Sequence, residues 1–176
     1  MFVGRGVRLD PQITGGGQER DRRGGTSNVP AIVGMGVAAE AAKDWLDSLD
    51  PTAPFAELES RRDRFESAIR ETLSDVVEVA TNGGDAPRLW TTANLGFTRL
   101  AAEGMLIAMS ERGVMASAGA ACSSGSLEPS PILMAMGVPE TVAHGSIRFS
   151  FARDTTDAEI DAAIPIVAEV VRAIAR

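Results

Sequence analysis

In the middle of the chain, the spacing of apolar residues alternates between a strand period and a helix period. Residues 76–81 (VVEVAT) and 91–97 (TTANLGF) are typical of short strands, and residues 101–113 (AAEGMLIAMSERG) are typical of a helix that ends at a glycine. Residues 114–117 (VMAS) predict a further short strand. Such an alternation over so few residues predicts an α/β fold, a small sheet packed with helices.

The residues before this segment predict a strand, a loop and two helices. Residues 1–9 (MFVGRGVRL) are read as the end of a strand, and a glycine-rich loop follows it. Asn28 is the expected N-cap of a helix that runs to about Leu49, with Pro30 in its first turn. A second helix is predicted for residues 55–73.

The residues after this segment predict a short helix, a half-buried strand and a long helix. The short helix covers residues 129–136 (PSPILMAM) and closes at a glycine. Residues 145–151 (GSIRFSF) alternate apolar and polar side chains, so Arg148 is expected to point away from the apolar face. Thr156 and Glu159 form a predicted capping box. The apolar stripe of the last helix consists of Ile160, Ile164, Val167, Val171 and Ile174.

Length, charge and composition exclude several classes of protein. A length of 176 residues suits one compact domain, and no apolar run is long enough to span a membrane. The net charge of -7 argues against general nucleic-acid binding. One cysteine and one histidine cannot form a disulfide or a zinc site, so no metal is expected. The N-terminus lacks a secretory signal pattern, and a cytoplasmic location is expected.

Cys122 is the first candidate functional residue, because it lies among small residues in SAGAACSSGSLEPS (117–130). It could be a small core residue, since cysteine is often buried. It could instead be a nucleophilic or sulfur-carrying thiol on a glycine-rich loop, which is the interpretation we prefer. A pairing of Cys122 with the single histidine, His144, as in a thiol hydrolase, has no supporting local motif.

Arg148 and Thr26 are the other candidates. Arg148 could cover a solvated face of its strand, or its guanidinium could bind a carboxylate through two hydrogen bonds. Thr26 follows the glycine-rich loop and precedes a helix N-terminus, where backbone N–H groups favour a phosphate. Glycine-rich loops are common, so this signal is weak by itself.

Three stretches of the chain resemble one family. GGGQERDRRGGTSNVPAIVG, SAGAACSSGSLEPS and AHGSIRFSF occur in the order and spacing of the pyridoxal-phosphate-dependent cysteine desulfurases of the class-V aminotransferase family that serve iron-sulfur cluster assembly. The resemblance implies the small C-terminal domain of a fold-type I pyridoxal-phosphate enzyme. It assigns residues 1–28 to the end of a large-domain strand and the cofactor and dimer loop, and residues 29–176 to the small domain with its connecting helix.

The resemblance also implies a role for each candidate. Cys122 matches the thiol that accepts sulfur from L-cysteine as a persulfide, with release of L-alanine. Arg148 matches the arginine that binds the substrate carboxylate, and Thr26 matches the threonine that binds the cofactor phosphate across a homodimer interface. An iron-sulfur scaffold or another sulfur acceptor protein is the implied partner.

The chain departs from these enzymes in one major respect. Family members carry the lysine that binds pyridoxal phosphate in a large domain, whereas the only lysine here, Lys43, lies in a predicted exposed helix and matches no catalytic position. The chain is therefore interpreted as the C-terminal part of a desulfurase that is inactive when isolated. The alternative is a non-catalytic dimerisation or sulfur-relay fragment that cannot turn over cysteine without a lysine-bearing partner.

Overall fold

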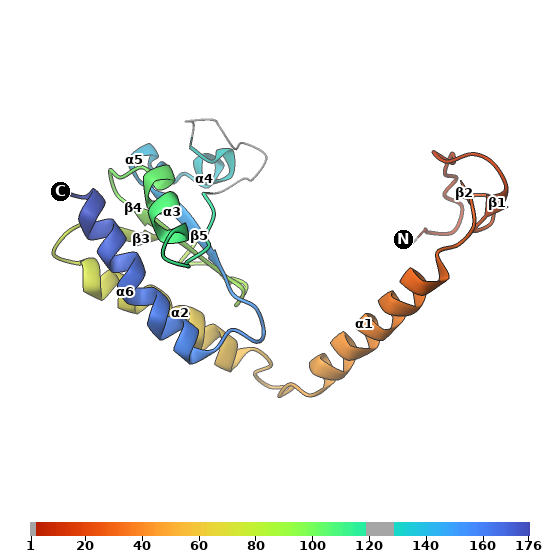
Figure 1. Ribbon diagram of the computed structural model, residues 1–176, viewed down its shortest axis with the longest axis horizontal. Coiled ribbons are helices and arrows are strands. Elements are labelled where there is room, and N and C mark those ends of the chain that lie inside the picture. Colours follow the sequence, from red (N-terminus) through yellow and green to blue (C-terminus); the bar gives the residue numbers. More distant parts are fainter. Residues whose placement is uncertain (1–2, 119–128) are drawn as a thin grey trace. The chain divides into compact units, whose positions relative to one another are not determined.

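The chain forms two compact units, Met1–Pro54 and Phe55–Arg176 (Figure 1). The computed structural model describes residues 3–118 and 129–176. The expectation of one compact domain is therefore not met, because the long helix of the first unit has no buried residue and adds nothing to a core. The predicted domain boundary after residue 28 stays a prediction. It concerns the domains of a whole enzyme and not the two units of this chain.

The first unit consists of a two-stranded ribbon and one helix. Strands β1 (Gly17–Gln18) and β2 (Arg23–Gly24) pair in antiparallel fashion. Helix α1 spans Val29–Asp47, and the Asn28 side chain accepts a hydrogen bond from Ala31 N, as an N-cap does. The start of this helix at Asn28 is confirmed.

The strand expected at the start of the chain is absent from residues 3–10. These residues have no strand pairing, and Arg5 and Gly6 form a turn in which Gly6 has φ +82°. A strand is stabilised by hydrogen bonds to a partner strand, and no described segment pairs with these residues. This prediction is therefore wrong for the described residues.

The second unit is a three-stranded antiparallel sheet with helices on both faces (Figure 1). The strand order is β3-β4-β5, and the long helices α2 and α6 pack side by side against one face. Its elements, in chain order, are α2 (Ala56–Leu73), β3 (Val79–Thr81), β4 (Thr92–Phe97), α3 (Ala102–Ser110), α4 (Pro131–Ala135), α5 (Glu140–Ala143), β5 (Ser146–Ser150) and α6 (Asp157–Ile174).

Strand β5 carries the alternation that its sequence predicts. Ile147 and Phe149 are buried on the face that meets α2 and α6, and Phe149 contacts Phe65 of α2 with ring centroids 4.9 Å apart. Arg148 is half-buried on the opposite face. The strand predicted for residues 114–117 is reduced to a single bridge between Ser117 and Arg148.

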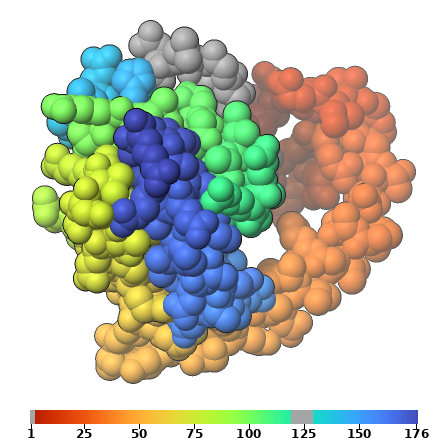
Figure 2. Space-filling view, turned by 60° about the vertical axis from the view of Figure 1, so that its left-hand side comes forward, coloured from red at the N-terminus to blue at the C-terminus, as the bar shows by residue number. Residues whose placement is uncertain are grey.

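The core lies between the sheet and the helices α2, α3 and α6. Figure 2 shows α6, in dark blue, crossing the surface of this unit beside the yellow and green segments. The predicted capping box of α6 is confirmed, with Thr156 and Glu159 bonded in both directions. The largest fully buried side chains are Phe97, Ile69, Leu73, Leu95, Met105, Met109, Ile147, Val167, Val170 and Val171.

The predicted apolar stripe of α6 is confirmed along most of its length. Ile160, Val167 and Val171 are buried, and Ile164 packs partly against the core. Ile174, the last residue of the helix, is 39% exposed. In the part of the chain that the structure describes, no helix combines the length and the apolar character needed to cross a lipid bilayer.

Candidate functional site

The sheet face that carries Arg148 is polar. Besides Arg148 of β5, the residues on this face include Thr92 and Asn94 of β4 and Ser146 and Ser150 of β5. Arg148 is the one charged residue within the three strands β3, β4 and β5. A single cation among neutral polar groups is suited to an anionic ligand, and a guanidinium binds a carboxylate through two parallel hydrogen bonds.

The backbone of Arg148 is paired on both sides. On one side it exchanges two hydrogen bonds with Ser117: Arg148 N–H donates to Ser117 O (2.7 Å), and Ser117 N–H donates to Arg148 O (3.1 Å). On the other side it is the register partner of Asn94 in β4. Both neighbours fix the position of the strand from which the guanidinium extends.

A hydrogen-bonded network next to Arg148 joins the three strands. Asn82, directly after β3, donates through Nδ2 to Asn94 Oδ1 (2.8 Å) and to Ser146 Oγ (2.9 Å). Ser146 Oγ in turn donates to the Val142 carbonyl of α5 (2.9 Å). Asn82 and Ser146 are both buried, so these bonds satisfy polar groups that water does not reach freely.

Sequence reasoning did not single out this network. The alternation of TTANLGF does place Thr92 and Asn94 on one face of β4, which was the available signal. Nothing in the sequence indicates that Asn82 and Ser146, 64 positions apart, are in contact.

The predicted thiol, Cys122, lies outside the described residues. Its role and any pairing with His144 stay predictions. His144 follows α5 as its C-cap residue, and its Nε2 lies 3.4 Å from Glu140 Oε1.

Thr26 lies in the first unit, whereas Arg148 lies in the second. Thr26 is exposed and is preceded by Gly25, which has φ +86°. The guanidinium of Arg23 donates to Ser27 Oγ (2.9 Å) and to the Gly24 and Gly25 carbonyls (3.2 and 2.5 Å). Arg23 therefore holds the loop that presents Thr26 just before the N-terminus of α1.

The loop also needs glycine at one position. A Cβ atom built on Gly24 would lie 2.6 Å from the Thr14 carbonyl oxygen, so a larger residue would displace the backbone. The exposed Thr26 hydroxyl can donate a hydrogen bond to a phosphate group, and the positive end of a 19-residue helix favours the phosphate charge. The described residues of this loop are therefore chemically compatible with the phosphate of pyridoxal phosphate.

Lys43 does not have the environment of a catalytic amine. Its side chain is 72% exposed on α1 and forms an ion pair with Asp47, one helical turn away. A reactive lysine normally requires burial or a neighbouring cation to lower its pKa. The predicted exposure of Lys43 is confirmed.

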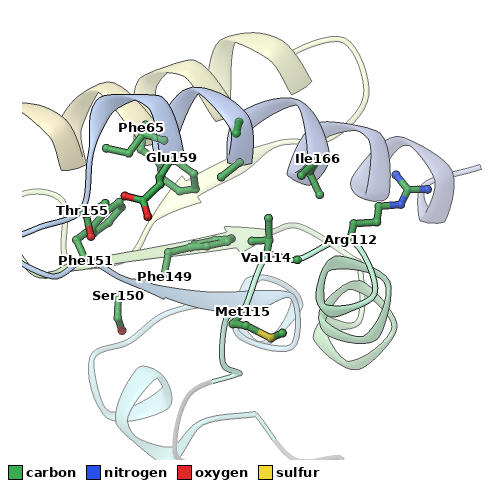
Figure 3. Close-up of a pocket in the computed structure, with 14 residues that line it drawn as sticks. Phe65, Arg112, Val114, Met115, Phe149, Ser150, Phe151, Thr155, Glu159 and Ile166 are labelled. Carbon is green, nitrogen blue, oxygen red and sulfur yellow. The ribbon is translucent and has the colours of Figure 1, made fainter.

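The second unit also contains a largely apolar cleft of about 460 Å³ beside α6 (Figure 3). Phe65, Phe149 and Phe151 line it together with residues of α6. Glu159 also lines the cleft, and its carboxylate accepts hydrogen bonds from Thr156 N and Oγ1 in the capping box. Arg112 is the cation among its lining residues, and it forms an ion pair with Glu169. Arg148 does not line the cleft, so the cleft is separate from the candidate site. Over residues 3–118 and 129–176, no cluster of three or more His, Cys, Asp or Glu side chains could hold a metal ion.

Comparison with known proteins gives the family. The model of the aminotransferase class-V family matches residues 6–163. This chain belongs to the class-V aminotransferase family. The predicted fold class is confirmed for this class-V chain: it is α/β, the small C-terminal domain of a fold-type I enzyme.

Relatives of this class-V chain include cysteine desulfurases. The cysteine desulfurase of Gluconacetobacter diazotrophicus is 44% identical over 171 residues, which are 97% of this chain and 41% of that protein. A solved NifS-like protein is 26% identical to this chain and superposes on it with a TM-score of 0.68. The match covers 96% of this chain and 40% of the NifS-like chain. SspA, solved in complex with cysteine, is 32% identical to this chain, with a TM-score of 0.50. The match covers 84% of this chain and 37% of the SspA chain. The class-V chain thus spans about two fifths of the length of these relatives.

Proposed function

We propose that this chain is the sulfur-accepting portion of a pyridoxal-phosphate-dependent cysteine desulfurase. The observation that carries the proposal is the position of Arg148, a single cation on a neutral polar sheet face, held by Ser117 on one side and Asn94 on the other. Identity of 44% to a cysteine desulfurase along 97% of the chain supports the same reaction class. The proposed overall reaction transfers sulfur from L-cysteine to Cys122 and releases L-alanine.

Arg148 would bind the carboxylate of L-cysteine. Its guanidinium presents a rigid set of donors, and its half-buried position strengthens a charge-assisted hydrogen bond relative to bulk water. Binding at the carboxylate orients the amino acid and leaves its side-chain sulfur at the opposite end. Substrate orientation is therefore the role of this sheet face.

Cys122 would then accept the sulfur as a persulfide. A thiolate is the reactive form of cysteine, and small residues surround Cys122 in the sequence. Ser117, whose backbone pairs with Arg148, is five positions before Cys122. The segment that is hydrogen-bonded to the carboxylate anchor therefore leads to the thiol within five residues along the chain.

Thr26 would hold the cofactor phosphate through its hydroxyl. Pyridoxal phosphate, when bound, supplies the electron sink that activates the substrate amino acid. The loop braced by Arg23 positions the Thr26 hydroxyl, and the positive end of α1 favours the phosphate charge.

The proposal includes a partner that carries the cofactor lysine. Helix α1 is apolar on several sides and has no buried residue. A helix of this kind is normally covered by protein. Its exposed large apolar side chains are Val29, Ile32, Val33, Met35, Val37 and Leu46. We assign this surface to contacts within a homodimeric, cytoplasmic enzyme that includes a lysine-bearing domain and delivers sulfur to an iron-sulfur scaffold.

The second candidate is a sulfur-relay fragment that does not itself turn over cysteine. The exposure of Lys43, the only lysine of the chain, favours this alternative. The two candidates differ in a simple measurement. The desulfurase forms persulfide on Cys122 directly from L-cysteine once the lysine-bearing portion is added, whereas the relay accepts sulfur only from a persulfide donor.

The test uses an assembled enzyme, which is this chain co-expressed with the portion of the Gluconacetobacter diazotrophicus cysteine desulfurase that it does not match. L-Cysteine should add the mass of one sulfur atom to this chain and release L-alanine. Cys122→Ser should abolish the mass gain, and Ser117→Ala should serve as the control that keeps it. An assembled enzyme that releases no alanine and gains no sulfur would refute the desulfurase proposal.

A further inference from the structure

Strand β3 forms one edge of the three-stranded sheet. The strand order is β3-β4-β5, so β3 pairs with β4 on one side only, and Arg148 lies on β5 at the opposite edge. All three residues of β3 are partly exposed. An edge strand whose outer backbone groups are unpaired can bind an extended segment of another chain by strand addition.

The backbone groups of Val79 and Thr81 point away from β4. Directly after β3, Asn82 N–H donates to Asn94 O of β4 (2.9 Å). In an antiparallel pair, the residues that bond to the partner strand alternate along the chain. Ala80 therefore also directs its N–H and C=O groups toward β4, whereas Val79 and Thr81 direct theirs to the open side.

Most of the outward groups of β3 are free to bind another strand. Of the four, only the Thr81 carbonyl is bonded, and it accepts from Gly84 N–H (3.2 Å) in the turn after β3. The N–H and C=O of Val79 and the N–H of Thr81 have no protein partner among residues 3–118 and 129–176. An added antiparallel strand pairs with these groups by exchanging two bonds with Val79 and accepting one from Thr81.

A polar cavity of about 380 Å³ lies where α2 meets the end of β3. Ser67 and Arg70 line it from α2, and Thr81 lines it from β3. Gly84 and Asp85 of the following turn complete this side of the cavity. Because Thr81 belongs both to the open edge and to the cavity, a strand added at β3 brings its side chains to the cavity.

Two carboxylates of this cavity are already paired with arginines. Both oxygens of Glu66 accept from the Arg88 guanidinium (2.6 and 3.0 Å), and Asp63 Oδ1 lies 2.7 Å from Arg62 Nη2. Asp85 is exposed and forms no ion pair within the part of the chain that the structure describes. The paired groups leave little net charge in the cavity apart from Asp85 and one arginine.

That arginine is Arg70, which has no carboxylate partner among the described residues. Its Nη1 donates to Thr81 Oγ1 at 3.4 Å, and its Nη2 donates to Ser67 Oγ at 3.3 Å. Both bonds are longer than the usual value of about 2.9 Å, and both acceptors are neutral. A guanidinium held in this way can bind a carboxylate more strongly than the two hydroxyls. Its contact with Thr81 places it at the end of the open edge.

We infer that the open edge of β3 and Arg70 form a docking site for an extended segment of a partner protein that carries an acidic side chain. The backbone of the segment pairs with Val79 and Thr81, and its carboxylate binds the guanidinium of Arg70. Strand addition supplies the affinity, and the arginine selects the acidic side chain. The site is on the other edge of the sheet from Arg148, and the inference does not depend on the function proposed above.

The test uses two fluorescein-labelled hexapeptides that differ in one side chain. Both alternate threonine and valine, and one carries a glutamate where the other carries a glutamine. Fluorescence anisotropy measures their binding to the full 176-residue chain, and NMR spectra follow the amide signals of Val79 and Thr81. Both peptides should shift these two signals, and the glutamate peptide should bind about threefold more tightly or better.

Three substitutions separate the two parts of the site. Arg70→Gln should lower the affinity for the glutamate peptide to that for the glutamine peptide, and leave the latter unchanged. Arg176→Gln, the matched control, removes the same charge from the exposed last residue and should change neither affinity. Val79→Pro removes an outward N–H but no bond to β4, so it should weaken both peptides. Thermal unfolding of each variant is recorded in parallel.

Several results would overturn the inference: neither peptide binds, the two peptides bind equally, or Arg70→Gln weakens both by the same factor. Binding that leaves the signals of Val79 and Thr81 unshifted would also overturn it, because the peptide then docks elsewhere. If Val79→Pro lowers the unfolding temperature, the comparison of the two peptides with Arg70→Gln decides. The assembled enzyme should bind the glutamate peptide as well, and loss of binding there would show that the edge is covered and not open to a partner protein.

Discussion

Ser117 and Arg148 form a hydrogen-bonded backbone pair at the edge of the sheet, with N–H···O distances of 2.7 and 3.1 Å. The pair is the only one that the structure shows between residues 114–118 and β5. It fixes the backbone of Arg148 on the side opposite Asn94. The proposed carboxylate anchor is therefore built by three chain segments that are distant in sequence.

Arg148→Lys tests the anchor in the assembled enzyme. Lysine keeps the charge but loses the planar set of donors, so KM for L-cysteine should rise about tenfold or more while the chain stays folded. Steady-state alanine release measures KM, and circular dichroism monitors the fold. Arg112→Lys is the matched control, because Arg112 forms an exposed pair with Glu169. An unchanged KM in Arg148→Lys would argue against the anchor.

Glu66→Ala tests a buried ion pair that fixes the loop before β4. Both carboxylate oxygens of Glu66, which is 3% exposed, accept from Arg88 at 2.6 and 3.0 Å. Removal of one partner leaves the other charge partly buried, so the free energy of unfolding should fall by about 3 kcal/mol. Urea denaturation followed by fluorescence measures this change.

The matched control is Glu57→Gln, which removes an exposed pair with Arg61 and should change the free energy of unfolding by less than about 1 kcal/mol. The combined substitution of Glu66→Met with Arg88→Leu should recover much of the stability, because neither charge of this pair remains. A loss as small in Glu66→Ala as in the control would contradict the assigned burial.

Gly145→Ala tests a close backbone approach immediately before β5. A Cβ atom at this position would lie 2.1 Å from the Phe97 carbonyl oxygen and 2.9 Å from that of Leu100. Because both atoms belong to the backbone, the free energy of unfolding should fall by about 2 kcal/mol or more. Gly104→Ala, in α3, is the control: its Cβ would meet only Ile174 Cδ1 at 3.8 Å, and it should stabilise the chain by about 0.5–1 kcal/mol. Thermal unfolding should show changes of opposite sign.

Glu159 makes stability dependent on acid pH. Hydrogen bonds from the backbone N–H and the hydroxyl of Thr156 hold the pKa of Glu159 below its ordinary value of 4.5. A carboxyl group whose pKa is lower in the folded state contributes stability at pH values above its unfolded pKa. That contribution is lost as the pH falls from about 4.5 through the folded pKa.

Glu159→Gln isolates this contribution, since glutamine keeps the capping hydrogen bond to Thr156 N–H but does not titrate. Urea midpoints measured from neutral pH down to about pH 3 should fall less steeply in Glu159→Gln than in wild type. Parallel curves for the two proteins would show that the lowered pKa of Glu159 does not affect folding.

Elements with a local sequence signal were predicted well. The N-cap and capping box at Asn28 and Thr156 depend on residues within one helical turn, and both are present. The alternation in β5 correctly placed Arg148 on the polar face. Helix α5 was missed, because four residues are too few to display a helical period.

Two predicted strands do not form as strands among the described residues, although β3, β4 and β5 lie where their sequences predicted them. Residues 3–10 have no strand to pair with among the described residues, and residues 114–117 pair through Ser117 alone. Strand formation requires hydrogen bonds to another segment, which composition does not specify.

The sequence by itself determined the residue types available for chemistry: a single thiol at Cys122, a single amine at Lys43, and motifs in the order of a known family. It also determined that Arg148 lies on a polar face, because side chains alternate along any strand. Only the tertiary structure decided that Asn82, Asn94 and Ser146 meet beside that arginine. Their contact follows from the register of three antiparallel strands, and register is set by packing of the whole core and not by local sequence.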